Sequence, residues 1–117
     1  MKATRMRVHP GHSRLLVLAL LFLPLSGLAE SWTLSAEEWS RPRSAEVIMA
    51  MPAVSSAMRQ WEREEGSRLE LVYPGGERGE LWAAELRDWL VALGAEADRI
   101  AVLPGSGDED ELLLRLR

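Results

Sequence analysis

The first 29 residues differ in kind from the rest of the chain, and this division limits how much of the sequence can fold into a domain. Lys2 and three arginines precede an apolar run at residues 15–25, and small residues follow it as far as Ala29. A basic start, a short apolar centre and a small-residue exit are the parts of a cleavable secretory signal. We therefore predict a signal peptide over residues 1–29 and a periplasmic protein. The alternative is an uncleaved inner-membrane anchor, for which the apolar run is short.

The remaining residues 30–117 form one acidic unit, whose composition argues against several kinds of partner. All 18 acidic residues but only 10 of the 14 basic ones lie here, which gives a net charge of −8. Such a charge opposes binding to nucleic acid and attraction to anionic lipid. We therefore predict no nucleic-acid partner and, once the signal is cleaved, no stable insertion into a membrane.

The same residues contain no Cys, His or Lys, which restricts the chemistry open to the chain. Nucleophilic triads and imidazole-based zinc sites are excluded by that absence. We accordingly predict no catalytic residue, no metal and no cofactor. Catalysis by two carboxylates remains open, as in a small glycan hydrolase, although a chain of this size can hardly build the substrate cleft that such an enzyme needs.

The apolar pattern of residues 30–117 predicts strands and helices in the order β-α-β-α-β-β. The predicted strands lie within residues 31–40 and at 68–73, 99–103 and 112–117, and the predicted helices span residues 44–65 and 79–93. Two features complicate this pattern. Ser35 to Glu38 also matches a helical capping box, so a helical turn competes with the first strand. Pro52 interrupts the first helix and is expected in the first turn of its main part.

These elements predict an α+β fold, a two-layer sandwich with a mixed four-stranded sheet and two helices on one face. The strand–helix–strand step from Leu69 to Val102 should place its two strands in parallel. The short link from Leu103 to Leu112 should join the last two strands as an antiparallel hairpin. Residues 30–117 are thus expected to form a single domain.

A strand that ends at Tyr73 is followed by a turn, a helix with regularly spaced apolar and small residues, and another strand. The positions concerned are Ala83, Leu86, Leu90, Gly94 and Ile100. This pattern resembles the second half of an OmpA-like periplasmic domain, whose helix runs approximately Arg-Ala-x-x-Val-x-x-x-Leu-x-x-x-Gly. The resemblance implies the scaffold of that family for residues 30–117 and a place in the bacterial cell envelope.

The departures from the OmpA-like pattern concern its ligand site. That family binds peptidoglycan through an Asp at the end of the second strand and an Arg on the second helix, and here Gly75 and Trp82 stand near those positions. A tryptophan cannot form the paired hydrogen bonds that an arginine makes to a carboxylate. We therefore predict a non-catalytic binding or structural module that acts through an envelope protein partner or assembly. Peptidoglycan binding through an altered site is the alternative.

The turn at residues 73–80 is the most distinctive candidate for a binding site. Its three glycines precede a helix and could expose N–H groups to an anion, but Glu77 and Glu80 oppose this. A tight turn that requires glycine is the structural alternative. A small zwitterion or a peptide would suit this turn better than a phosphate. The candidate residues here are Tyr73, Gly75, Gly76, Glu77, Arg78 and Trp82.

Five tryptophans in the predicted domain are an unusual supply of aromatic surface. Trp61, Trp82 and Trp89 lie on apolar helical stripes and are expected in the core. Trp32 and Trp39 have no such pattern and could lie exposed as anchors for a partner. The acidic run 108–111 follows a glycine-containing loop and is expected to be a solvated loop, because its spacing does not match a calcium-binding loop.

Overall fold

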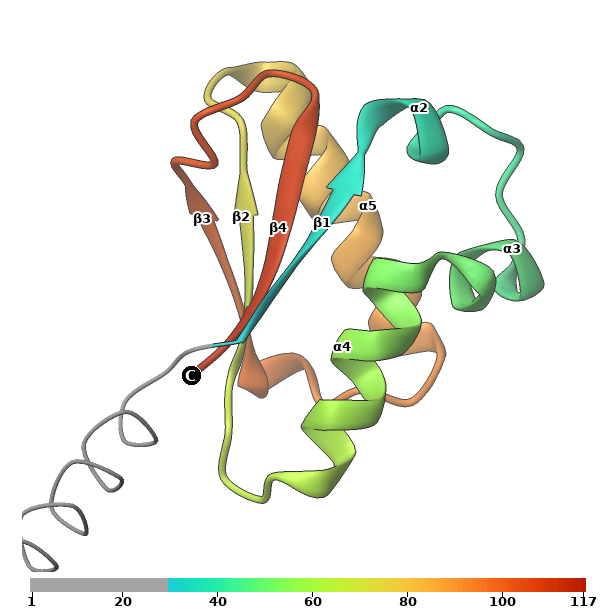
Figure 1. The fold of residues 1–117 in the computed structure, drawn as a ribbon, viewed down its shortest axis with the longest axis vertical. Coiled ribbons are helices and arrows are strands. Elements are labelled where there is room, and N and C mark those ends of the chain that lie inside the picture. Colours follow the sequence, from blue (N-terminus) through green and yellow to red (C-terminus); the bar gives the residue numbers. More distant parts are fainter. Residues whose placement is uncertain (1–29) are drawn as a thin grey trace, which may run out of the picture.

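The computed structural model describes residues 30–117, and the predicted signal segment 1–29 lies outside the described residues. The described chain has a mixed four-stranded sheet and four helices (Figure 1). In chain order the elements are β1 (Ser31–Ser35), α2 (Ala36–Trp39), α3 (Ala45–Ala50), α4 (Pro52–Arg63), β2 (Leu69–Tyr73), α5 (Glu77–Ala92), the 3-10 turn η1 (Ala97–Arg99), β3 (Ile100–Pro104) and β4 (Glu111–Leu116). The predicted α+β class and mixed four-stranded sheet are confirmed.

The first segment contains both of the structures that compete for it in the sequence. β1 ends at Ser35, and α2 begins directly after it. The Ser35 hydroxyl accepts a hydrogen bond from the Glu38 N–H at 3.1 Å, and the Glu38 carboxylate accepts one from the Ser35 N–H at 3.3 Å. This reciprocal capping box satisfies two donors at the junction, so a strand can turn at once into a helix.

Pro52 divides the predicted first helix into α3 and α4, as its position indicates. Met51 is extended, with φ −68° and ψ 121°, and Pro52 is the first residue of α4. A proline disfavours helical backbone in the residue before it and has no N–H that the first turn would need to satisfy. α4 then buries Val54, Ala57 and Trp61 along one stripe.

The sheet has the order β1-β4-β2-β3, and one of its faces carries the core. β2 and β3 pair in parallel, as predicted, whereas β4 pairs antiparallel with both β1 and β2. α4 contacts β1 and β4, α5 contacts β2 and β3, and Figure 1 shows both helices to the same side of the sheet. Alternation places the fully buried leucines of the sheet on that face. These are Leu34, Leu69, Leu71, Leu112 and Leu114.

The predicted hairpin between the last two strands is wrong, because β2 lies between β3 and β4. The loop after β3 passes over the end of β2, where the N–H groups of Gly105 and Ser106 donate to the carbonyl of Tyr73 at 2.8 and 3.1 Å. Neighbouring strands lie roughly 4.8 Å apart, so a link of this length reaches across one strand. β4 is therefore a central strand, which explains why its alternate leucines are so deeply buried.

Candidate functional site

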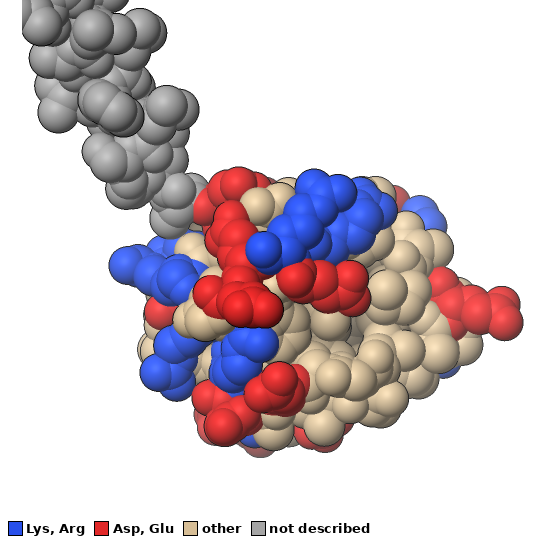
Figure 2. All heavy atoms as spheres, turned by 90° about the horizontal axis from the view of Figure 1, so that it is seen from below, with Lys and Arg blue, Asp and Glu red and all other residues tan. Residues whose placement is uncertain are grey.

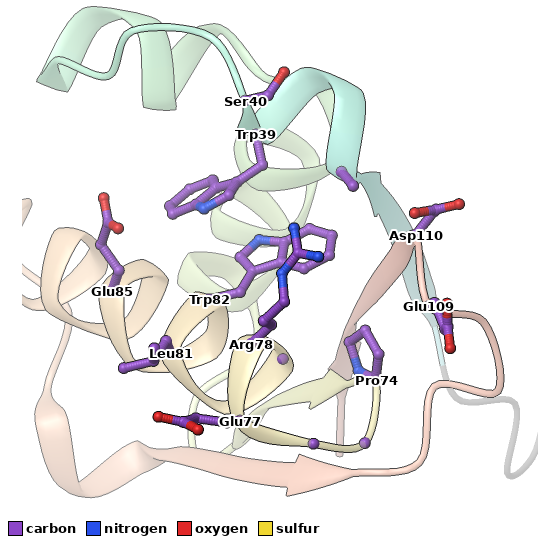
Figure 3. Close-up of a pocket in the computed structure, with 14 residues that line it drawn as sticks. Trp39, Ser40, Pro74, Glu77, Arg78, Leu81, Trp82, Glu85, Glu109 and Asp110 are labelled. Carbon is purple, nitrogen blue, oxygen red and sulfur yellow. The ribbon is translucent and has the colours of Figure 1, made fainter.

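A cleft of about 670 Å³ lies at the end of the sheet where β2 finishes (Figure 3). Three segments line it: α2 with the residue that follows, the turn and first helical residues 74–82, and the loop before β4. We call this part of the molecule, with these three segments, the cleft end. It is the upper end of the sheet in Figure 1.

The turn from β2 into α5 forms one wall of the cleft and depends on two glycines. Gly76 has φ +92°, a backbone conformation that other residues rarely adopt. A Cβ on Gly79 would lie 1.9 Å from the carbonyl oxygen of Pro74, so the first turn of α5 can approach β2 only with glycine there. Gly75 has neither constraint. The tight-turn interpretation therefore explains two of the three glycines.

The N-terminus of α5 opens toward the cleft without a cap. No side chain of the described residues caps it, and its first main-chain bond runs from the Glu80 N–H to the Gly76 carbonyl at 3.1 Å. The N–H groups of Glu77, Arg78 and Gly79 therefore have no hydrogen-bond acceptor in the described part of the chain. A helix leaves its first donors unpaired within itself, and they require an outside partner or water.

Trp39 and Trp82 form the floor of the cleft, with ring centroids 6.3 Å apart and planes at 26°. Each is only 8% exposed. Trp82 is thus a core residue, as predicted, but Trp39 is not the exposed anchor that we considered, because it packs against Trp82. The Nε1–H of Trp82 is buried and has no hydrogen-bond partner among the described residues.

Arg43 fastens the α2 side of the cleft to α5. Its guanidinium lies 4.5 Å from the centroid of the Trp39 ring and donates to both carboxylate oxygens of Glu85, at 2.6 and 3.3 Å. It also donates to the carbonyl of Trp39. Sequence reasoning missed this residue, because Arg43 and Glu85 are 42 positions apart and belong to no motif.

The charges around the cleft are mostly acidic and mostly unpaired. The carboxylates of Glu77, Glu109 and Asp110 form no ion pair within residues 30–117, and Arg78 has no acidic partner there either. Beside them Leu81 is 63% exposed, more than any other large apolar side chain of the described chain. Figure 3 shows these side chains around the mouth and the two tryptophans between them.

The cleft brings together most of the predicted site residues. Those that line it are Gly75, Gly76, Glu77, Arg78, Trp39 and Trp82. Tyr73 and Trp32 do not line it: both are half-buried and pack against the core. Leu81, Glu109 and Asp110 are among the lining residues that the predicted site did not include.

The chemical groups in the cleft are carboxylates, one guanidinium, free N–H donors and an apolar floor. Within residues 30–117, no group of three or more acidic side chains is placed to hold a metal ion. None of the helices described there is long and apolar enough to span a bilayer. No protein-family model and no curated protein matches the chain.

Proposed function

We propose that residues 30–117 are a secreted, non-catalytic binding module of the bacterial cell envelope that acts through a protein partner or an envelope assembly. The observation that carries this proposal is the cleft, where unpaired donors and unpaired acids surround an apolar floor. Hollows that combine an apolar lining with a few convergent polar groups are the usual form of a binding site. Buried polar groups are normally hydrogen-bonded, so the unpaired Nε1–H of Trp82 indicates a group kept for a partner.

Periplasmic location and the OmpA-like relationship belong to the same proposal. The basic and apolar pattern of residues 1–29 supports export, with no membrane anchor once it is cleaved. The order of elements, and the single leucine-rich face of the sheet, support a two-layer OmpA-like scaffold. The ligand groups of that family do not accompany the scaffold here, which favours a protein partner over peptidoglycan.

Binding suits the acids of the cleft better than catalysis does. A glycan hydrolase needs one carboxyl group that burial keeps protonated and a second that stays ionised. Glu77, Glu109 and Asp110 are all exposed, and none lies in an apolar pocket that would tune it as an acid. Their arrangement instead offers negative charge to whatever enters the cleft.

Site-specific photo-crosslinking in intact cells tests this function. A photoreactive amino acid in place of Leu81 would sit at the cleft, and one in place of Val91 would sit near the far end of the same helix. Val91 is a matched control, because it is also an exposed apolar residue of α5. We expect a discrete envelope protein to be crosslinked from position 81 and not from position 91. Equal labelling from both positions, or none from either, would count against the proposal.

Retention of the protein on isolated sacculi separates the alternative function from this one. If the cleft binds a protein and not peptidoglycan, retention should equal that of an unrelated acidic protein of similar size. Retention well above that level, lost on Arg78→Ala, would support peptidoglycan binding through an altered site instead.

A further inference from the structure

We propose that the partner segment that enters the cleft is an extended peptide carrying a basic side chain next to an apolar one. This inference rests on the proposed function and names the chemistry of the partner. It follows from four features of the cleft: its charge, its own example of guanidinium binding, its unpaired donors and its exposed leucine.

The charge of the cleft calls for a cation. Residues 30–117 carry a net charge of −8, and three of their exposed acids line the cleft without an ion pair in the described chain. Arg78 is the single basic side chain of these residues that lines the cleft with them. The charge of Glu85 is already balanced by Arg43. Glu109 and Asp110 lie together in the loop before β4, across the cleft from Arg78 in Figure 3. Complementary charge both steers a partner to such a surface and fixes its register.

Two residues that line the cleft, Trp39 and Glu85, already bind a guanidinium, that of Arg43. Arg43 stacks on the ring of Trp39 and forms a two-point contact with Glu85, which combines cation–π attraction with a forked ion pair. The same ingredients, tryptophan and carboxylate, continue into the cleft with Trp82, Glu109 and Asp110. A second basic side chain, supplied by a partner, would find the same kind of surroundings.

The unpaired donors distinguish a peptide from a small cation. The Trp82 Nε1–H and the first N–H groups of α5 require acceptors. An amine or a metal ion has no acceptor to offer, whereas the main chain of a peptide carries a carbonyl at every residue. Leu81, exposed at the rim, adds an apolar contact for a neighbouring side chain of the same peptide. A peptide with a basic residue next to an apolar one would offer a cation to the acids, carbonyls to the first N–H groups of α5 and an apolar side chain to Leu81.

A phage-displayed library of random short peptides, selected on the protein produced from its full-length gene, tests this inference. The parent protein is compared with the double variant Glu109→Gln and Asp110→Asn. The matched control is Glu62→Gln with Glu65→Gln, which removes two exposed acids near the end of α4, outside the cleft. We expect the parent and the control to enrich peptides that contain Lys or Arg beside an apolar residue. The cleft variant should bind those peptides about tenfold more weakly.

A third variant, Leu81→Arg, obstructs the rim of the cleft. It tests whether peptides use the cleft separately from whether they are basic. Peptides that lose binding on Leu81→Arg but carry no excess of Lys or Arg would overturn the basic chemistry and leave the cleft as the binding surface. If no selected peptide is sensitive to either the rim variant or the acid variant, both this inference and the use of the cleft in the proposed function are wrong. Unfolding curves for each variant confirm that any loss of binding does not arise from loss of the fold.

Discussion

The two ends of the sheet treat their polar groups in opposite ways. At the lower end of Figure 1, which we call the paired end, the carbonyl of Ser67 accepts hydrogen bonds from Trp61 at 3.0 Å and from Arg99 at 3.0 and 2.7 Å. Glu70 binds both Arg115 and Arg117 there, at 2.8 and 3.1 Å. Figure 2, seen from below, shows acidic and basic side chains in contact with one another.

The cleft end has the same kinds of groups and leaves them without partners. Its tryptophan N–H is unbonded, its helix N-terminus is uncapped, and its outer acids form no ion pair within residues 30–117. Buried polar groups in folded proteins are normally hydrogen-bonded, as they are at the paired end. The unpaired groups at the cleft end therefore need an explanation. The fold is therefore closed at the paired end, and we place the proposed function at the cleft end.

The largest effect is expected where the cleft end is most tightly built, at Gly79. Gly79→Ala would place a methyl group 1.9 Å from the carbonyl oxygen of Pro74, so either β2 or α5 must shift. We expect a loss of about 2–3 kcal/mol in the free energy of unfolding, measured by urea denaturation. Gly75→Ala, with open space and no unusual φ, is the matched control and should change stability by less than about 0.5 kcal/mol. Equal stabilities for the two variants would show that the turn tolerates a side chain.

Arg43 provides the next largest effect, because it forms an ion pair with Glu85, which lines the cleft. Arg43→Ala removes the contacts to Glu85 and Trp39, whose side chains are partly shielded, and should cost about 1–2 kcal/mol of unfolding free energy. The same substitution should also loosen the attachment of α2 to α5 and weaken peptide binding at the cleft. Arg41, an exposed arginine that forms no ion pair with the described residues, provides the control, and Arg41→Ala should leave stability nearly unchanged. A neutral Arg43→Ala would mean that packing alone holds this wall.

At the paired end, Glu70 makes stability depend on pH. Partial burial on its own would raise the pKa of the Glu70 carboxyl, but the hydrogen bonds and charges of Arg115 and Arg117 outweigh it and hold the pKa below the ordinary value. A lowered pKa in the folded state stabilises the protein above the ordinary glutamate range, and this contribution is lost as the pH falls through the lowered value.

Glu70→Gln should therefore cost about 0.5–1 kcal/mol at neutral pH and progressively less in acid, measured by urea unfolding across the pH range. The control is Glu62→Gln, which removes an exposed acid that forms no ion pair within residues 30–117 and should show no such trend. If Glu70→Gln lowers the free energy of unfolding by the same amount at every pH, the ion pairs of Glu70 with Arg115 and Arg117 do not stabilise the protein through charge.

Local signals in the sequence predict the elements of this fold well. β2 spans residues 69–73, within the predicted strand at 68–73, Pro52 starts α4, and the Ser35 capping box marks the start of α2. Each of these depends on residues close together in the chain. The error in the order of the last strands has a different origin, since the loop after β3 crosses β2 and no local pattern records which strand lies beneath a loop.

The candidate site could be predicted only in part, for the same reason. The turn at residues 75–78 is visible as a cluster of glycines, and it does form one wall of the cleft. The opposite wall comes from α2, which Arg43 links to Glu85, and the acidic rim comes from the loop before β4. The burial of Trp39 also depends on a neighbour 43 positions away, Trp82. Contacts between residues so far apart in the sequence depend on how the sheet assembles, and the spacing of residues does not predict them.

The most direct test of the comparison is the same substitution made once at each end. Trp61→Phe removes an N–H that donates to Ser67, whereas Trp82→Phe removes an N–H that has no partner within residues 30–117. The two tryptophans are similarly buried, at 6% and 8% exposed, so the loss of ring volume is matched. Both variants should lose the stability that the removed ring volume contributes, and we predict from urea unfolding that Trp61→Phe costs about 1 kcal/mol more than Trp82→Phe. A Trp82→Phe variant destabilised as much as Trp61→Phe would contradict the account, because the Trp82 N–H would then already be serving the fold.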